Sequence, residues 1–264
     1  MTRLVRFRSP DGTRTSTVDE LPVEPLDQET LELPEPYELL MPVEPPEVWC
    51  AGVTYKRSRD ARIEESRIDV YSLVYGAERP ELFLKDAVCR RTVGPGKPVG
   101  VRSDSSWDVP EPEIALVLGG DGEIEGYTIG NDVSSRAIEG ENPLYLPQAK
   151  LFAGACAIGP AILPADGPAP EFEIRMRIVG PADDELFAGE TTTAKMQRSF
   201  AELVGWLRRD NPVPPGSVLL TGTGLVPPDD FTLEPGQRVE IHVPGIGTLV
   251  NPVGRAADLM TKEL

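Results

Sequence analysis

Apolar residues along this chain fall mostly into short runs, which predict β-strands more often than helices. The continuous apolar run at 114–118 predicts a buried strand, and the alternation at 172–179 predicts a strand with one exposed face. Further strands are predicted at 48–53 and within 216–224, and a hairpin closes the chain at 239–250. The fold class that follows is α+β and rich in strands.

Helical spacing of apolar residues is clear at one place. Met196, Phe200, Leu203 and Leu207 fall on one face of a helix over 193–209, which we expect to pack on the sheet.

The first part of the chain differs in composition from the rest. Residues 1–46 are rich in Pro and Glu, with an edge strand predicted at 4–7, and a charged helix is predicted at 54–65. We therefore predict a small N-terminal domain at 1–70 and a catalytic domain at 71–264.

Acidic residues gather around the buried strand at 114–118. Glu111 and Glu113 stand two apart at its start, so their side chains project on the same side. A second short strand ending at Asp132 can return antiparallel through the glycine-rich turn at 119–122. An isolated Glu-x-Glu is usually a solvated strand end, but here the pair borders a core. The return strand could bring a third acid to it.

Three carboxylates without a nearby His or Cys offer hard oxygen ligands. Such a set suits Mg²⁺, with Mn²⁺ as the alternative, and leaves positions for substrate and water.

Composition excludes several other classes. The chain has 264 residues, 40% of them hydrophobic and 26% charged, with a net charge of −17. That acidity argues against nucleic acid as a partner. No apolar run approaches a membrane span and no signal-peptide pattern begins the chain, so we expect a cytoplasmic enzyme without a membrane partner. The three cysteines are widely spaced and form no CxxC pair, which disfavours a zinc site or a disulfide framework.

Four segments resemble the fumarylacetoacetate hydrolase superfamily: VPEPEIALVL, GYTIGNDVSSRAIEGENPLYLPQAK, LLTGTG and VEIHVPGIGTLVNPV. They occur in the family's order across 47–254, and the ENPLYLPQAK segment is most similar to the dehydratases of 2-keto-3-deoxy sugar acids. The resemblance implies a mixed β-sandwich and β-roll with a small N-terminal domain. It also implies a homo-oligomer, either a dimer or a tetramer.

The implied reaction is the Mg²⁺-dependent dehydration of 2-dehydro-3-deoxy-D-arabinonate to 2,5-dioxopentanoate. A divalent metal that chelates a 2-oxo acid polarises the ketone and acidifies the C3 protons, so that a hydroxyl on C4 can leave as water. Glu111, Glu113 and Asp132 would hold the metal, with Lys150 and Glu81 as catalytic proton carriers. The implied substrate-binding residues are Lys85, Arg136, Gln148 and Thr223.

The absence of a histidine at one position helps to separate the alternative reactions of the superfamily. Hydrolytic members of the superfamily usually carry a His a few residues after the position of Tyr55, and this chain has Ser58 near that place. Its single histidine, His242, falls in a late predicted strand and is expected to be structural. This disfavours acylpyruvate hydrolysis, while oxaloacetate decarboxylation and a non-catalytic sugar-acid-binding role stay open.

Overall fold

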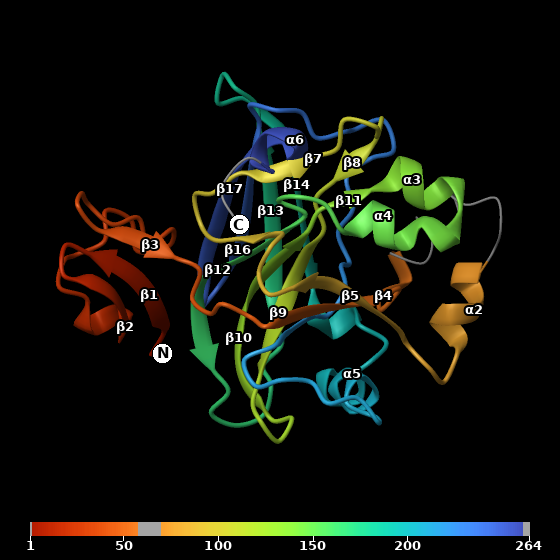
Figure 1. Ribbon diagram of the computed structural model, residues 1–264, viewed down its shortest axis with the longest axis horizontal. Coiled ribbons are helices and arrows are strands. Elements are labelled where there is room, and N and C mark those ends of the chain that lie inside the picture. The colour runs from red at the N-terminus through yellow and green to blue at the C-terminus, as the bar shows by residue number, and fades with distance from the viewer. Residues whose placement is uncertain (1, 58–69, 261–264) are drawn as a thin grey trace.

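The computed structural model describes residues 2–57 and 70–260, and its centre is a ten-stranded sheet (Figure 1). The strands run in the order β2-β1-β12-β10-β9-β15-β4-β5, with β3 paired to β1 and β6 to β12. Their bounds are β1 (Leu4–Ser9), β2 (Gly12–Thr17), β3 (Glu38–Leu40), β4 (Glu47–Gly52), β5 (Glu81–Ala87), β6 (Thr92–Val93), β9 (Pro112–Leu118), β10 (Ile124–Asp132), β12 (Cys156–Pro164) and β15 (Val218–Leu220).

A second sheet of five strands covers one face of the first. Its order is β14-β13-β16-β17-β7. The alternating exposure along β13 confirms the pattern predicted for this segment, and the β16–β17 hairpin confirms the predicted closing hairpin. The bounds are β7 (Val99–Val101), β13 (Glu173–Val179), β14 (Glu185–Thr192), β16 (Arg238–Val243) and β17 (Gly247–Arg255).

The core lies between the two sheets. Ile114 and Leu116 of β9 pack in one buried cluster with Ile174 and Met176 of β13 and with Ile241 of β16. The other face of β9 is also covered, because a smaller cluster forms around it, so every residue of this strand is buried. A strand buried on both faces is continuous in apolar residues, which is why 114–118 has no alternation.

The hairpin of β9 and β10 forms as predicted. The two strands pair antiparallel, with Glu113 opposite Gly130, through a turn in which the Gly119 amide donates to the Glu123 carbonyl at 2.8 Å. Gly122 has a φ of +88°, a conformation that favours glycine. The pairing of this hairpin sets the position of Asp132, the last residue of β10, relative to the start of β9.

Short helices lie beside the end of this hairpin. After β10, the two-residue strand β11 (Ser134–Ser135) pairs with β8 (Asp108–Val109), and α3 (Arg136–Glu141) begins with the Ser135 hydroxyl accepting from the Ile138 amide. The chain continues through a 3-10 turn into α4 (Leu146–Lys150), next to α3 in Figure 1. The proline-containing segment before Lys150, for which we expected a structured loop and no long helix, is therefore partly helical.

The amphipathic helix predicted over 193–209 is shorter than expected. A 3-10 turn occupies Thr193–Lys195, and α5 spans only Phe200–Leu207, with Ser199 as its N-cap. Between them the Gln197 amide donates to the Thr54 carbonyl at 2.9 Å, so the backbone there pairs with another segment and cannot continue a helix.

The N-terminal strands β1, β2 and β3 lie on the side of the molecule away from α3 and α4 (Figure 1). The prediction that 4–7 forms an edge strand is wrong, because β1 pairs with β12 as well as with β2 and β3. The domain boundary at residue 70 stays a prediction. Most of the charged helix predicted at 54–65 lies outside the described residues.

The remaining helices are short. They are α2 (Val70–Gly76) and α6 (Ala256–Leu259). Among the described residues, none of the helices has both the length and the apolar character needed to cross a membrane. All three cysteines are free thiols, and Cys50 and Cys156 are buried.

Candidate metal centre and active site

Three carboxylates meet at the end of the β9–β10 hairpin. Glu111 immediately precedes β9 and Glu113 is its second residue. Asp132 is the last residue of β10, and its amide donates to the Glu111 carbonyl at 3.0 Å. Each offers a carboxylate oxygen within 4.8 Å of the others, and the three side chains are buried. The hairpin register thus brings together the three acids that the sequence suggested as metal ligands.

Glu113 is held by a glycine-rich segment. Its Oε2 accepts from the Gly222 amide at 2.5 Å. Gly222 has a φ of +91°, and a Cβ at this position would lie 2.1 Å from Thr54 Oγ1. Only glycine therefore allows this backbone amide to approach the carboxylate so closely.

Three buried cations contact the other two acids. The Arg136 guanidinium donates through Nη2 to Glu111 Oε1 at 2.7 Å. Lys150 Nζ donates to Glu111 Oε2 and to Asp132 Oδ2, both at 2.9 Å, and to the Ser134 hydroxyl at 2.5 Å. Lys85 Nζ forms an ion pair with Asp132 Oδ1. Glu111 and Asp132 are therefore well compensated, whereas Glu113 has no ion pair within the described part of the chain.

Burial raises the pKa of Glu113 well above its ordinary value, and the negative charges of Asp132 and Glu111 raise it further. The Gly222 amide and the Lys150 ammonium lower it by less. Three adjacent carboxylates thus favour either a proton on Glu113 or an added positive charge. A divalent cation with oxygen ligands supplies that charge, so the donor set fits Mg²⁺ or Mn²⁺.

A pocket opens beside the three acids. Glu81, Glu139, Lys150 and Thr223 also line it. Gly52 of β4 lies opposite Glu81, and a Cβ on it would come 2.1 Å from Glu81 Oε2, so the glycine makes room for this carboxylate.

The structure divides the predicted catalytic and substrate-binding residues into three groups. Glu81, Lys150 and Thr223 line the pocket, and the Thr223 hydroxyl donates to the Leu225 carbonyl at 3.0 Å. Arg136 and Lys85 are buried and contact the carboxylates. Gln148 is exposed on α4 and is not among the residues that line the pocket.

Glu139 is a pocket residue that the sequence reasoning missed. It is 2% exposed and lies on α3, three residues after Arg136. Residues three apart share a helix face, so the turn that directs Arg136 to Glu111 also directs Glu139 inward. That spacing was visible in the sequence.

His242 lies away from the pocket, on β16. Its Nδ1 is 3.0 Å from the Thr248 hydroxyl of the neighbouring strand β17. The only histidine of the chain is therefore no neighbour of the three acids.

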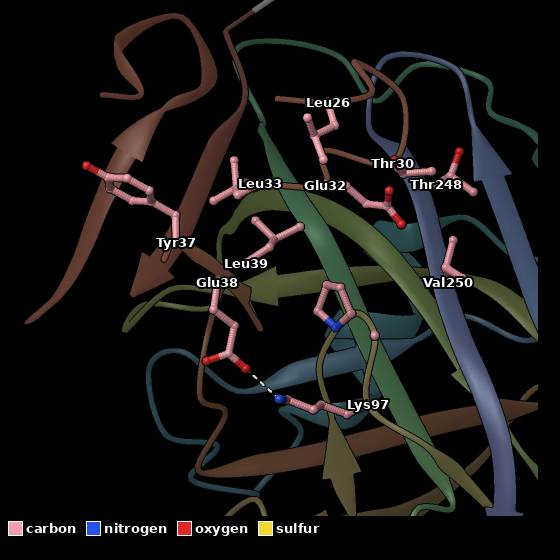
Figure 2. Close-up of a pocket in the computed structure, with 12 residues that line it drawn as sticks. Leu26, Thr30, Glu32, Leu33, Tyr37, Glu38, Leu39, Lys97, Thr248 and Val250 are labelled. Atoms are coloured by element: carbon pink, nitrogen blue, oxygen red, sulfur yellow. Dashed lines mark hydrogen bonds and ion pairs between the residues drawn. The ribbon is translucent and has the colours of Figure 1, made fainter. Parts of the chain in front are cut away.

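A second, larger pocket lies between the N-terminal segment and β17 (Figure 2). Leu33, Leu39 and Val250 give it apolar walls, and the Lys97 ammonium that reaches it is paired with Glu38 at 2.5 Å. Within the described residues, the only cluster of three or more potential metal ligands is Glu111, Glu113 and Asp132. The described residues that line the second pocket therefore offer no such cluster of potential metal ligands.

Comparison with known proteins identifies the class. The family described as fumarylacetoacetate (FAA) hydrolase C-terminal matches residues 47–254. The chain belongs to this family, which confirms the predicted family and the strand-rich α+β fold.

Three of the similar proteins are named as dehydratases of sugar acids. A Haloferax volcanii protein, "Probable 2-keto-3-deoxyxylonate dehydratase", is 52% identical over 215 residues, which are 81% of this chain and 74% of that protein. A Saccharolobus solfataricus protein, "2-dehydro-3-deoxy-D-arabinonate dehydratase", is 46% identical over 219 residues, 80% of this chain and 73% of that one. A solved 2-keto-3-deoxy-D-arabinonate dehydratase complexed with magnesium and 2,5-dioxopentanoate superposes with a TM-score of 0.84 at 37% identity, covering 96% of this chain and 99% of that chain.

Proposed function

We propose that this protein is a Mg²⁺-dependent dehydratase that converts 2-dehydro-3-deoxy-D-arabinonate to 2,5-dioxopentanoate. The observation that carries the proposal is the buried cluster of three carboxylates in contact with the Lys150 amine. The two sugar-acid dehydratases at 52% and 46% identity support the substrate class. The related structure with magnesium and the product supports both the metal and the reaction.

Glu111, Glu113 and Asp132 would hold the ion. Bound Mg²⁺ supplies a Lewis acid that polarises the 2-oxo group of the substrate and lowers the pKa of the C3 protons. The three carboxylates come from one rigid hairpin, so their spacing is set before any ligand arrives.

Lys150 is the group we propose for the C3 proton. Its Nζ donates to one oxygen of Glu111 and one of Asp132 and lies over the Phe83 ring, 5.6 Å from the ring centroid. Such contacts hold the amine in one position beside the metal ligands. A base has to be neutral, so in this role Lys150 would give up a proton before it takes one from C3.

Glu81 is the group we propose for the leaving hydroxyl. Loss of the C4 hydroxyl as water needs a proton, and Glu81 reaches the pocket from β5, a different strand from those of the metal ligands. The Thr223 hydroxyl would bind the substrate carboxylate. The substrate-binding roles of Lys85, Arg136 and Gln148 stay predictions, and the ion pairs of the first two favour a role in holding Asp132 and Glu111.

The test is a Mg²⁺-dependent assay on 2-keto-3-deoxy sugar acids of four to six carbons, with the aldehyde product measured by NMR. We expect turnover of the five-carbon acid that EDTA abolishes and Mg²⁺ restores. Acylpyruvate and oxaloacetate, offered in the same assay, should not be cleaved or decarboxylated at a comparable rate. Turnover that survives EDTA, or faster cleavage of an acylpyruvate, would reject the proposal.

We also propose that the protein acts in the cytoplasm as a homo-oligomer, a dimer or a tetramer. The family membership supports the assembly, and the acidic, disulfide-free chain supports the location. Light scattering of the purified protein tests the assembly, and a monomer at micromolar concentration would contradict it.

A further inference from the structure

The proposed reaction needs more proton transfers than the loss of water alone. Removal of a C3 proton and of the C4 hydroxyl gives a C3=C4 double bond conjugated to the 2-oxo group, with the hydroxyl still on C5. The product 2,5-dioxopentanoate instead has an aldehyde at C5. A hydrogen must therefore leave C5 as a proton while C3 and C4 each regain one.

These steps balance without any oxidant. A base takes a proton from C5, the C4=C5 bond forms, and the electrons of C3=C4 move toward the 2-oxo group. C3 then takes up a proton, and the resulting C4=C5 enol becomes the aldehyde when its hydroxyl proton is lost and C4 is protonated. The conjugated intermediate and the aldehyde product are isomers. Their interconversion, the second stage of the reaction after the loss of water, needs only a base and an acid at defined carbons.

We propose that Glu139 is the base that serves C5, an inference that rests on the proposed function. Of the five carboxylates that line the pocket, three form the metal cluster and Glu81 is assigned to the leaving hydroxyl. Glu139 is the carboxylate that remains, and it is 2% exposed. Lys150, already assigned to C3, returns a proton there.

The orientation of the substrate supports this assignment. The substrate has a carboxylate at one end and a neutral hydroxyl at the other. A divalent cation held by Glu111, Glu113 and Asp132 would attract the substrate carboxylate, and Glu139 would repel it, so the neutral C5 end would lie toward Glu139. A carboxylate there accepts a hydrogen bond from the C5 hydroxyl and is then near the hydrogen that has to leave.

The helix that carries Glu139 keeps it in position. The Ser135 hydroxyl caps α3, and Arg136 in its first turn is tied to Glu111 at 2.7 Å. One short helix therefore holds a metal ligand through Arg136 and presents Glu139 to the same pocket. A base fixed by such contacts is what a proton transfer from carbon requires.

The experiment separates the two stages of the reaction in Glu139→Gln, with Glu141→Gln as the matched control. Glu141 is exposed on the same helix and is not among the pocket residues, so this control removes the same charge elsewhere. Substrate loss and aldehyde formation are followed by NMR, and the conjugated intermediate by ultraviolet absorbance. Substrate with deuterium at C5 reports the proton transfer directly, and Mg²⁺-induced thermal stabilisation checks the metal centre.

We expect Glu139→Gln to consume substrate and accumulate the conjugated 2-oxo-3-enoate, with aldehyde formation about 100-fold slower than in the wild type. Glu139→Asp should restore part of the second stage, and Glu141→Gln should behave as the wild type. Wild-type protein should release one C5 deuterium to solvent with an isotope effect on the second stage only.

Two results would overturn the inference. One is that Glu139→Gln forms aldehyde as fast as it loses substrate, with no intermediate. The other is that both stages, or Mg²⁺ stabilisation, decline together, which would indicate a role in the metal centre. If the wild type itself fails to dehydrate the substrate, the proposed function falls and this inference falls with it.

Discussion

Replacing Glu113 by Gln should have opposite effects on the metal-free and the metal-loaded protein. In the metal-free protein, Glu113 is the one acid of the three without an ion pair among the described residues, and its carboxylate accepts a hydrogen bond from the Gly222 amide at 2.5 Å. Gln removes the charge and keeps an oxygen that can accept from that amide. With Mg²⁺ present, the same change removes one of the three proposed anionic ligands.

The gain in unfolding free energy that Glu113→Gln gives the metal-free protein can be estimated from the distances between the acids. Ligand oxygens of the three acids lie within 4.8 Å of one another. Two unit charges at that separation repel by about 3.5 kcal/mol at an effective dielectric constant of about 20. Lys150 and Arg136 offset part of this repulsion through their contacts with the other two acids. We therefore expect Glu113→Gln to raise the metal-free unfolding free energy by about 2–3 kcal/mol, which raises Tm by about 5–10 °C.

The pH dependence of this gain has a definite sign. Because the pKa of Glu113 is raised in the folded protein, the folded chain keeps a proton that the unfolded chain releases above about pH 4.5. Wild-type stability therefore falls by about 1.4 kcal/mol for each pH unit between the unfolded and the folded pKa. The advantage of Gln disappears near and below the unfolded pKa and grows as pH rises.

The assay is thermal unfolding with EDTA and with Mg²⁺ at several pH values. Mg²⁺ at about 100 times its Kd should stabilise the wild type by about 2.7 kcal/mol, and Glu113→Gln should show no such shift. Glu123→Gln, an exposed acid in the β9–β10 turn, is the control and should match the wild type in both conditions. A lower Tm than wild type for Glu113→Gln in EDTA at pH 8, or a full Mg²⁺ shift, would refute the reasoning.

Three further substitutions test the remaining groups. Lys150→Met should lower kcat by about 10²–10⁴ while Mg²⁺ still stabilises the protein, and a wild-type kcat would remove Lys150 from the reaction. Arg136→Met leaves Glu111 without its guanidinium partner in a buried site, so denaturant unfolding should show a loss of about 3–5 kcal/mol, and wild-type stability would contradict this. Glu81→Gln should slow dehydration by about 10²–10⁴ without changing Mg²⁺ affinity in calorimetry, and weaker Mg²⁺ binding would instead place it among the ligands.

The cluster of three acids could be predicted because its members are close in sequence and their proximity follows from strand geometry. Glu111 and Glu113 share a face by the two-residue period of a strand, and the turn at 119–122 returns the chain to Asp132. Local rules of this kind hold whatever surrounds the hairpin, and the family motifs added the reaction.

The partners of the charged side chains could not be predicted in the same way. A lysine or arginine near an acidic site can bind a substrate anion or a protein carboxylate, and only the fold decides. Lys85 and Arg136 pair with Asp132 and Glu111. Gln148 points outward because α4 turns Ala149 and Lys150 inward, a consequence of a short helix where a loop was expected.

The errors in secondary structure have a common cause. At 193–209 the apolar spacing is helical, but the backbone before Ser199 finds partners near Thr54. At 4–7 the alternation predicts a strand, but no local signal reveals that it pairs with β12, where Leu4 lies opposite Ile162. Both depend on contacts between distant segments.

The three buried cations around Glu111 and Asp132 have a consequence for how the protein matures. Because three cations face the two acids they touch, and Glu113 can hold a proton, the acids do not depend on magnesium for compensation of their charge. We therefore expect the polypeptide to reach its native shape before the ion arrives, so that uptake of magnesium is a late and reversible event.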